Sequence, residues 1–179
     1  MCFQIEGHGE YFIHLIFVWF ISYNRIMIKP KVFLDTSIIS AYFDNREPYR
    51  QKLTKQFWYD RLPDLDIFIS DIVLTEVLNN TEENENLKKM MLELIDTFTV
   101  LQLTKEAEEL TEEYLKKGIF SVKSIFDANH VAIATVNSIT YLASWNYKHL
   151  VKVKTRFEVN SINNANGYNN IQIITPPEL

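Results

Sequence analysis

The sequence predicts a three-layer α/β/α fold in which helices cover both faces of a central, mostly parallel sheet. From Lys31 onward, short apolar runs of strand length alternate with longer segments of helical periodicity. Such alternation is typical of a parallel sheet whose strands are joined by crossover helices. The 179 residues, 47% of them hydrophobic, fit one domain whose core needs no disulfide.

The expected strands are short apolar runs, in the order Val32 to Leu34, Ile67 to Ser70, Phe98 to Leu103, Tyr141 to Ser144 and Ile171 to Ile174. The expected helices show apolar residues at helical spacing and cover Ser37 to Phe43, Tyr49 to Arg61, Ile72 to Asn79, Asn84 to Ile95, Lys105 to Lys117, Ile125 to Asn137 and Lys148 to Val159. The Asn-rich segment from Asn160 to Asn170 predicts a polar loop before the last strand.

The first 26 residues differ from the rest of the chain. Their apolar run, Phe12 to Ile21, is far shorter than the roughly 20 residues that a membrane-spanning helix needs. A secretory signal is not expected, because acidic residues come before any lysine or arginine and no small-residue cleavage site follows. We expect residues 27 to 179 to form the domain, and residues 1 to 26 to be an appended segment or the product of an upstream start. An amphipathic helix on a membrane surface is the alternative, although the basic face of such helices is missing.

Composition excludes several classes of protein. A net charge of −5 argues against nucleic-acid binding through global positive charge, so any such contact must be local or metal-mediated. Cys2 is the only cysteine, which rules out an intramolecular disulfide or a CxxC site and suits a reducing cytoplasm. No GxxxxGK[ST], GxGxxG, HExxH or GxSxG motif is present. The remaining candidates rely on carboxylate chemistry.

Four oxygen-bearing side chains stand near the expected sheet edge. Asp35 comes directly after the first strand, and Asn146 follows the fourth strand by two residues. Glu76 lies early in the helix that follows the second strand, and Asp127 lies early in the helix that precedes the fourth strand. Because ligands of open α/β sheets bind beyond the carboxyl ends of the strands, we expect these side chains to converge there.

Each of these residues also has a purely structural interpretation. Ser124 and Asp127 have the spacing of a capping box, in which Asp127 would bond the backbone N–H of Ser124. Asp35 could cap the following turn, and Glu76 could be an exposed helical residue. Asn146 could simply belong to a turn. An unpaired carboxylate beside the apolar neighbours of Glu76 is costly, however, and favours a bound cation.

Four segments carry a resemblance to a known family, in the same order and with the same spacing. They are Val32 to Ser37, Leu74 to Val77, Phe126 to Ala134 and Tyr141 to His149. Together they resemble the PIN-domain family, which includes the VapC-type toxins of bacterial toxin–antitoxin pairs. The resemblance covers essentially residues 27 to 179.

The resemblance implies an endoribonuclease that depends on Mg²⁺ or Mn²⁺, forms a homodimer and, in the toxin branch, is held inactive by an antitoxin protein. Asp35, Glu76 and Asp127 match the three family acids. Asn146 matches a fourth position that is often Asp, and Ser37 matches a Ser, Thr or Asn two residues past the first acid. The amide at Asn146 weakens the negative charge of the site without excluding catalysis.

Physical chemistry agrees with this implication, since Mg²⁺ prefers oxygen ligands and an acid cluster suits it better than zinc. We expect Asp35 and Asp127 to ligate the metal, and Glu76 either to ligate it or to orient the attacking water. Hydrolysis would proceed by attack of a metal-activated water on phosphorus. Ser37 would either hold a metal-bound water or cap the helix that follows it.

The only dense basic stretch runs from Lys148 to Arg156. Lys148 and Lys152 are four residues apart in the last expected helix, so they should share a helical face and contact RNA phosphates. A solvated helix face is the alternative.

Aromatic residues and histidines next to these motifs have two interpretations. Trp145 or Tyr147 could stack on an unpaired base, whereas the structural alternative for Trp145 is a place in the core. His130 and His149 are expected to be structural, with no catalytic role.

Two classes of function remain. One is an RNA-cleaving enzyme that could be the toxin of a toxin–antitoxin pair. The other is a catalytically idle PIN-like module that binds a partner protein or RNA. The three filled acidic positions favour the enzyme, because an idle module has no use for mutually repelling carboxylates. No membrane association is expected.

Overall fold

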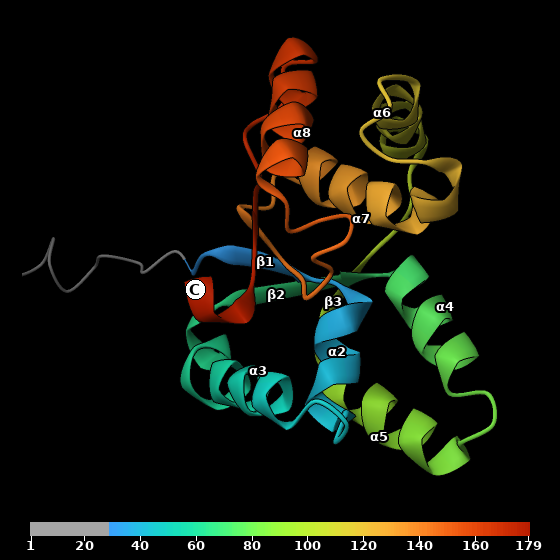
Figure 1. Cartoon of the computed structure of the whole chain (residues 1–179), viewed down its shortest axis with the longest axis vertical. Helices are drawn as coiled ribbons and strands as arrows, with labels where there is room; N and C mark the ends of the chain where they lie inside the picture. Colours follow the sequence, from blue (N-terminus) through green and yellow to red (C-terminus); the bar gives the residue numbers. More distant parts are fainter. Residues whose placement is uncertain (1–28) are drawn as a thin grey trace, which may run out of the picture.

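The computed structural model describes residues 29 to 179, which form a five-stranded sheet with helices on both faces (Figure 1). The strands are all parallel, in the order β3-β2-β1-β4-β5. Their bounds are β1 Lys31–Leu34, β2 Asp66–Ser70, β3 Thr99–Leu101, β4 Tyr141–Ala143 and β5 Gln172–Ile174. The predicted α/β/α fold with a parallel sheet is confirmed; the expectations for residues 1 to 26 lie outside the described residues.

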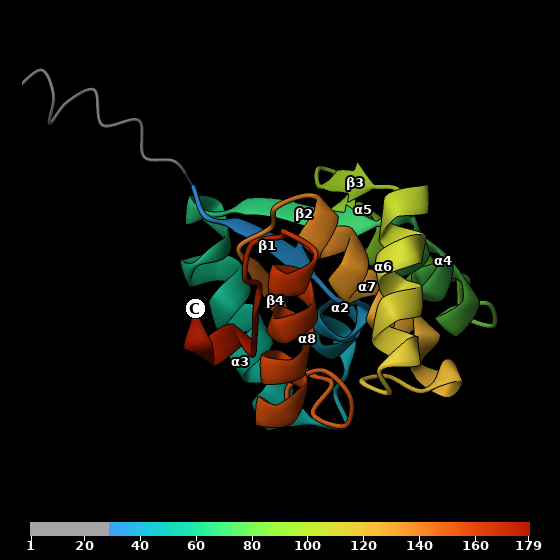
Figure 2. The ribbon, with the colours of Figure 1, turned by 90° about the horizontal axis from the view of Figure 1, so that it is seen from above.

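Helices form the two outer layers. On one face lie α2 (Thr36–Phe43), α3 (Pro48–Asp60), α4 (Asp71–Asn80) and α5 (Glu85–Ile95), below the sheet in Figure 1. On the other face of the sheet lie α6 (Lys105–Lys116), α7 (Ile125–Val136) and α8 (Val153–Ala165). Figure 2, seen from above, shows these three helices lying over the sheet. Short 3₁₀ turns η1 (Leu62–Asp64), η2 (Val122–Ser124) and η3 (Pro176–Glu178) complete the described chain.

The core lies on both faces of the sheet, as expected for parallel strands covered on either side. Phe33, Ile69 and Leu142 in the strands are inaccessible to solvent. Helix α7 is buried from Ala128 to Thr135 because it packs between the sheet and α6. Within residues 29 to 179, no helix combines the length and the apolar character that crossing a bilayer requires.

Strand β1 is the centre of the sheet and marks the point where the strand order reverses. The chain runs from β1 outward through β2 and β3, then returns to place β4 on the other side of β1. Crossovers on opposite faces leave a crevice beyond the carboxyl ends of β1 and β4, which is where open α/β sheets bind ligands. The register pairs Leu34 with Ala143, so the next residues of both strands enter this crevice together.

The prediction of a helix from Lys148 to Val159 is wrong at its start and correct from Val153 onward. Residues 147 to 150 form a turn, and α8 begins only at Val153. The turn is stabilised by Asn146, whose backbone carbonyl accepts N–H groups from Leu150 at 3.0 Å and Val151 at 2.9 Å. Lys148 therefore lies in the turn and Lys152 at the N-cap of α8, so the two lysines do not share a helical face.

The prediction of a polar loop from Asn160 to Asn170 is also wrong in its first half, because α8 extends to Ala165. Asn163 is fully buried, accepts a hydrogen bond from the Tyr114 hydroxyl and donates one of 3.2 Å to Thr135 Oγ1. The side chain of Asn160 donates to and accepts from the backbone of Ile171. These tertiary contacts outweigh the weak helix propensity of asparagine.

Candidate active site

Asp35 lies at the centre of the candidate site, directly beyond β1. It is 5% exposed, and its backbone N–H donates to the carbonyl of Ala143 at 3.1 Å, which extends the pairing of β1 with β4 by one residue. Its Oδ2 accepts hydrogen bonds from the hydroxyls of Ser37 at 2.5 Å and Ser144 at 2.7 Å. Two hydroxyls from different segments thus fix the orientation of one carboxylate.

Glu76 approaches the same crevice from α4. Its Oε2 accepts hydrogen bonds from Thr36 Oγ1 at 2.5 Å and from His130 Nε2 at 3.0 Å. Burial raises the pKa of Glu76, but the hydrogen bond and charge of His130 and the Thr36 hydroxyl outweigh it, so the net pKa is lowered. Glu76 is therefore held as a carboxylate, with 26% of its side chain exposed.

His130, on α7, links two of the acids. Its side chain is almost fully buried, and its Nε2 lies 3.7 Å from Asp35 Oδ1 as well as 3.0 Å from Glu76 Oε2. Burial lowers the pKa of His130, but the hydrogen bond to Glu76 and the charges of Asp35, Glu76 and Asp127 raise it above its usual value. The imidazole therefore favours its cationic form, a positive charge among three carboxylates.

Asp127 is joined to Asn146 across the site. The Asn146 amide donates to Asp127 Oδ1 at 2.8 Å, while the amide oxygen accepts the backbone N–H groups of Lys148 and His149, each at 3.1 Å. The oxygen that could have ligated a metal is thus used to stabilise the turn. Burial, followed by the charge of Asp35, raises the pKa of Asp127, and His149, Asn146 and His130 only partly offset this.

Two structural interpretations of these residues are wrong. Asp127 is not part of a capping box with Ser124, because the Ser124 backbone N–H donates to the carbonyl of Ser121 and the Ser124 hydroxyl pairs with Ser121. Ser37 is not the N-cap of α2, since it is the second residue of that helix. Its hydroxyl accepts the backbone N–H of Trp145 at 2.9 Å while donating to Asp35.

Each of the three acids uses only one of its two carboxylate oxygens in hydrogen bonds. The hydrogen bonds above use Oδ2 of Asp35, Oε2 of Glu76 and Oδ1 of Asp127, and leave the second oxygen of each carboxylate without a hydrogen bond in the described chain. Within residues 29 to 179, no three acidic, histidine or cysteine side chains already stand in a closed metal-binding arrangement. The donor set nevertheless fits a hard divalent cation, because it offers carboxylate oxygens and an excess of negative charge.

The residues after β4 divide into buried and exposed. Trp145 is 8% exposed, and its indole N–H donates to Thr54 Oγ1 on α3 at 2.9 Å, so it belongs to the core and cannot stack on a base. Tyr147 is 57% exposed. Lys148 and Lys152 are exposed, whereas Lys154 forms an ion pair with Glu158 at 3.8 Å.

Thr36, Ser144 and the full role of His130 were missed by sequence reasoning. Two of them carried a usable signal: Thr36 follows Asp35 directly, and His130 lies three residues after Asp127, on the same side of a helix. Ser144 could be linked to Asp35 only with knowledge that β4 pairs with β1, although the two residues are 109 positions apart.

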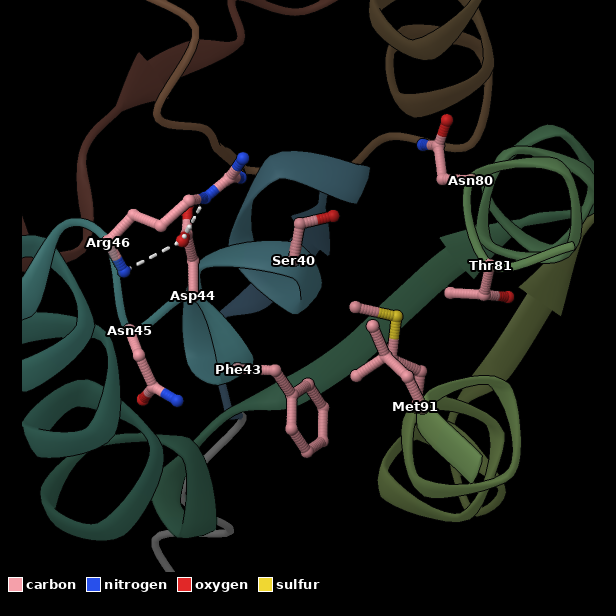
Figure 3. A pocket seen from close by; sticks show the side chains of 9 residues that line it. Ser40, Phe43, Asp44, Asn45, Arg46, Asn80, Thr81 and Met91 are labelled. Atoms are coloured by element: carbon pink, nitrogen blue, oxygen red, sulfur yellow. Dashed lines mark hydrogen bonds and ion pairs between the residues drawn. The ribbon is translucent and has the colours of Figure 1, made fainter. Parts of the chain in front are cut away.

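A cleft of about 520 Å³ lies between the end of α2 and the α4–α5 connection (Figure 3). Phe43 and Met91 face each other across it, and Arg46 is paired with Asp44 at its rim. The residues that line it are Ser40, Phe43, Asp44, Asn45, Arg46, Asn80, Thr81, Leu87 and Met91. None of the candidate acids is among them, so the cleft and the acid site are separate features.

Comparison with known proteins agrees with the fold. Residues 32–152 match the family model described as PIN domain. No curated protein shows significant sequence similarity to the chain. Among solved structures, the chain is similar to a toxin–antitoxin complex from Klebsiella pneumoniae, with 18% identity, a TM-score of 0.55 and coverage of 81% of this chain and 97% of that one.

Two further structures show the same fold. One is VapC20 from Mycobacterium tuberculosis, described as a sarcin-ricin loop cleaving toxin, with 18% identity, a TM-score of 0.54 and coverage of 79% of this chain and 98% of that one. The other is VapBC-1 from nontypeable Haemophilus influenzae, with 18% identity, a TM-score of 0.55 and coverage of 82% and 98%.

Proposed function

The chain belongs to the PIN-domain family, and we propose that it is a divalent-metal-dependent endoribonuclease that hydrolyses RNA phosphodiester bonds. One observation supports the proposal: Asp35, Glu76 and Asp127 come from three separate elements, each lie close enough to His130 to raise its pKa, and each keep one carboxylate oxygen without a hydrogen bond in the described chain. Open α/β sheets bind ligands beyond the carboxyl ends of their strands. Ionisable groups with shifted pKa values also tend to cluster at functional sites, and here both features occur at the same place.

Mg²⁺ or Mn²⁺ would be held by Asp35, Glu76 and Asp127, and when bound would activate water and offset charge on the phosphate. Against the three carboxylates the described site provides one internal cation, His130, so a negative charge remains for a divalent ion to balance. The raised pKa of Asp127, caused by burial and by the charge of Asp35, indicates that these acids repel each other without such an ion.

The chain's own residues orient these acids. Ser37 and Ser144 hold Oδ2 of Asp35 so that Oδ1 faces the crevice side, where His130 approaches. Thr36 and His130 hold Glu76, whose lowered pKa keeps it ionised, so that it can ligate the metal or orient the attacking water. Asn146 serves as a positioning residue for Asp127 through its amide N–H, and its oxygen is used by the turn.

Partners follow from the same proposal. The Klebsiella structure is a toxin–antitoxin complex, and the Mycobacterium relative is a toxin that cleaves the sarcin-ricin loop. We infer for this chain a role as a cytoplasmic toxin, active as a homodimer and inhibited by a small antitoxin protein. We propose exposed Lys148, in the turn, and exposed Lys152, at the start of α8, as two separate phosphate contacts.

A catalytically idle PIN-like module that binds protein or RNA is the second candidate. One observation favours it: within residues 29 to 179, no three acidic, histidine or cysteine side chains stand close enough together to hold a metal ion. If the chain is such an idle module, added metal should neither bind at these acids nor lead to cleavage of RNA.

The deciding experiment incubates the purified chain with total RNA in Mg²⁺, in Mn²⁺ and in EDTA. Asp35→Asn and Asp127→Asn keep the shape of the site but each remove one formal charge. We expect cleavage only with metal and only by the unmodified chain. Circular dichroism confirms that the variants fold, and isothermal titration should show weakened Mg²⁺ binding. Equal cleavage by folded variants would falsify the assignment of these acids, and no cleavage or metal binding by any form would favour the idle module.

A further inference from the structure

Trp145 anchors the segment that follows β4 to helix α3. Its side chain is buried, and its indole N–H donates to Thr54 Oγ1 at 2.9 Å. Thr54 is inaccessible to solvent, and its hydroxyl donates its single proton to the carbonyl of Arg50, one helical turn earlier, at 2.8 Å. An indole N–H can only donate, so Thr54 is its acceptor and the direction of both bonds is fixed.

The backbone of the same segment contacts the hydroxyls that hold Asp35. The N–H of Trp145 donates to Ser37 Oγ at 2.9 Å. The N–H of the next residue, Asn146, donates to Ser144 Oγ at 2.9 Å. Both hydroxyls donate in turn to Oδ2 of Asp35. Two consecutive backbone N–H groups therefore fix the two hydroxyls, and the position of the segment sets the orientation of the carboxylate.

Consecutive residues of this segment bind opposite layers of the fold (Figure 1). Trp145 is bonded to α3 on one face of the sheet, and Asn146 is bonded to Asp127 of α7 on the other. A shift of Trp145 would therefore disturb Asp35 through the hydroxyls and Asp127 through the amide of Asn146. Changing residues that orient metal ligands through hydrogen bonds commonly lowers metal affinity or activity.

We propose that Thr54 and Trp145 are positioning residues for the acid site, because their hydrogen bond fixes the segment that orients Asp35 and Asp127. The proposal rests on the proposed nuclease function. Thr54 acts from α3, which supplies none of the acids, through a series of hydrogen bonds that passes Trp145 and Ser37 and ends at Asp35. If the pair served only the core, its loss would lower stability but leave the metal affinity of the folded chain unchanged.

The test breaks the bond from either side in the full-length chain. Thr54→Val removes the hydroxyl and keeps the shape of the side chain, whereas Thr54→Ser keeps the hydroxyl. Trp145→Phe keeps an aromatic ring and removes the indole N–H. Thr81→Val is the matched control, because Thr81 is also buried and donates to the carbonyl four residues earlier, at 2.6 Å. Within residues 29 to 179, no indole donates to Thr81.

Three quantities are measured: amide hydrogen exchange by NMR in EDTA, Mg²⁺ affinity by isothermal titration, and kcat and KM for RNA cleavage. In Thr54→Val and Trp145→Phe, we expect the N–H groups of residues 145 and 146 to exchange faster while those of β1 exchange as in the parent. Mg²⁺ affinity or kcat should fall by about tenfold, the lower end of the range for residues that orient metal ligands, with KM for RNA unchanged. Thr54→Ser and Thr81→Val should stay close to the parent. Combining Thr54→Val with Trp145→Phe should cost little more than either change alone, since both remove the same bond.

The outcomes separate the positioning role from the nuclease function. If the parent cuts RNA and folded Thr54→Val matches it in kcat and Mg²⁺ affinity, the nuclease function stands and the positioning role fails. Equal losses in Thr81→Val would also overturn the proposal, because they would show a general effect of losing a buried hydroxyl. If exchange at residues 145 and 146 accelerates but the parent neither binds Mg²⁺ nor cuts RNA, the nuclease function fails and the anchoring of the segment by Thr54 stands. If Trp145→Phe does not fold, the contrast between Thr54→Val and Thr54→Ser decides.

Discussion

Replacing His130 with alanine should release the carboxylates from the one cation that holds them in the described site. The imidazole is almost fully buried and donates to Glu76 Oε2 at 3.0 Å. Removing one partner of a buried ion pair typically costs about 3–5 kcal/mol, because the other charge is left uncompensated. Glu76 remains 26% exposed and keeps its bond from Thr36, so we expect a loss of stability of about 3 kcal/mol, at the lower end of that range.

The pH dependence of this effect has a definite sign. The raised pKa of His130 means that its contribution is fully present below its unfolded value of 6.5 and is lost as pH rises through the higher folded value. The lowered pKa of Glu76 means that its contribution is present above its unfolded value of 4.5 and is lost as pH falls through the folded value. Both contributions are therefore complete between pH 4.5 and 6.5.

Asp127 acts in the opposite direction. Because burial and the charge of Asp35 raise its pKa, its ionisation destabilises the folded chain, and stability falls as pH rises through that pKa. This slope should survive the loss of His130. The variant should thus lose the decline of stability above pH 6.5 that we expect of the parent, while keeping the pH dependence that Asp127 causes.

Urea unfolding followed by circular dichroism, repeated across this pH range in EDTA, measures the effect. His149→Ala is the comparison variant: its ring forms no hydrogen bond in the described chain and its charge lowers the pKa of Asp127, so it should change the contribution of Asp127 and leave the bond between His130 and Glu76 in place. A second series with Mg²⁺ should restore more stability to His130→Ala than to the parent, because the variant has more uncompensated charge. A loss below about 1 kcal/mol, with an unchanged pH profile, would refute the role assigned to His130.

Three further changes test other parts of the structure. Ser144→Ala should lower Mg²⁺ affinity or cleavage by about 10- to 100-fold, with recovery in Ser144→Thr, because Asp35 loses an orienting hydroxyl; equal metal binding and cleavage in Ser144→Ala would contradict this. Asn163→Ala should lower the free energy of unfolding by about 2–5 kcal/mol, since two buried partners lose their hydrogen bonds; urea titration measures it, and cleavage in the cold should persist. Lys148→Ala with Lys152→Ala should reduce the salt dependence of RNA binding by about 0.7 per lost contact; an unchanged slope would show that both lysines are merely solvated.

Local pattern predicted most of the fold. The apolar runs located all five strands, and β1, β2, β4 and β5 begin and end within one residue of the expected bounds. Parallel strands buried on both faces have nearly continuous apolar sequences, which makes them easy to recognise. The polar residues that follow such runs then predicted the position of Asp35 and Asn146 beyond the sheet, and the structure brings both to the crevice.

The errors arose where tertiary contacts decide local structure. The segment after Asn146 was predicted as a helix because its charges and apolar residues have helical spacing, but the Asn146 side chain and carbonyl bind four backbone N–H groups and fold it into a turn. The Asn-rich segment was predicted as a loop because asparagine favours turns. Only the contacts of Asn163 with α6 and α7, absent from any local pattern, make it helical.

The candidate site was predicted as a set of acids but not as a network. Sequence spacing identified Asp35, Glu76 and Asp127, whereas the hydroxyls and the imidazole that orient them depend on which strands and helices become neighbours. Their contribution to the proposed metal and RNA chemistry stays a prediction until the variants above are measured.

The bond between Ser144 and Asp35 has a consequence for the time course of synthesis. Its partners are 109 residues apart, so closing this contact requires almost the whole domain to have left the ribosome. The chain emerges with Asp35 and Glu76 first, but β1 has no neighbour on its β4 side until Tyr141–Ala143 has been made. Nascent chains and fragments that stop before β4 carry Asp35 without its orienting hydroxyl from Ser144, so the proposed nuclease activity would be delayed until the polypeptide is nearly finished.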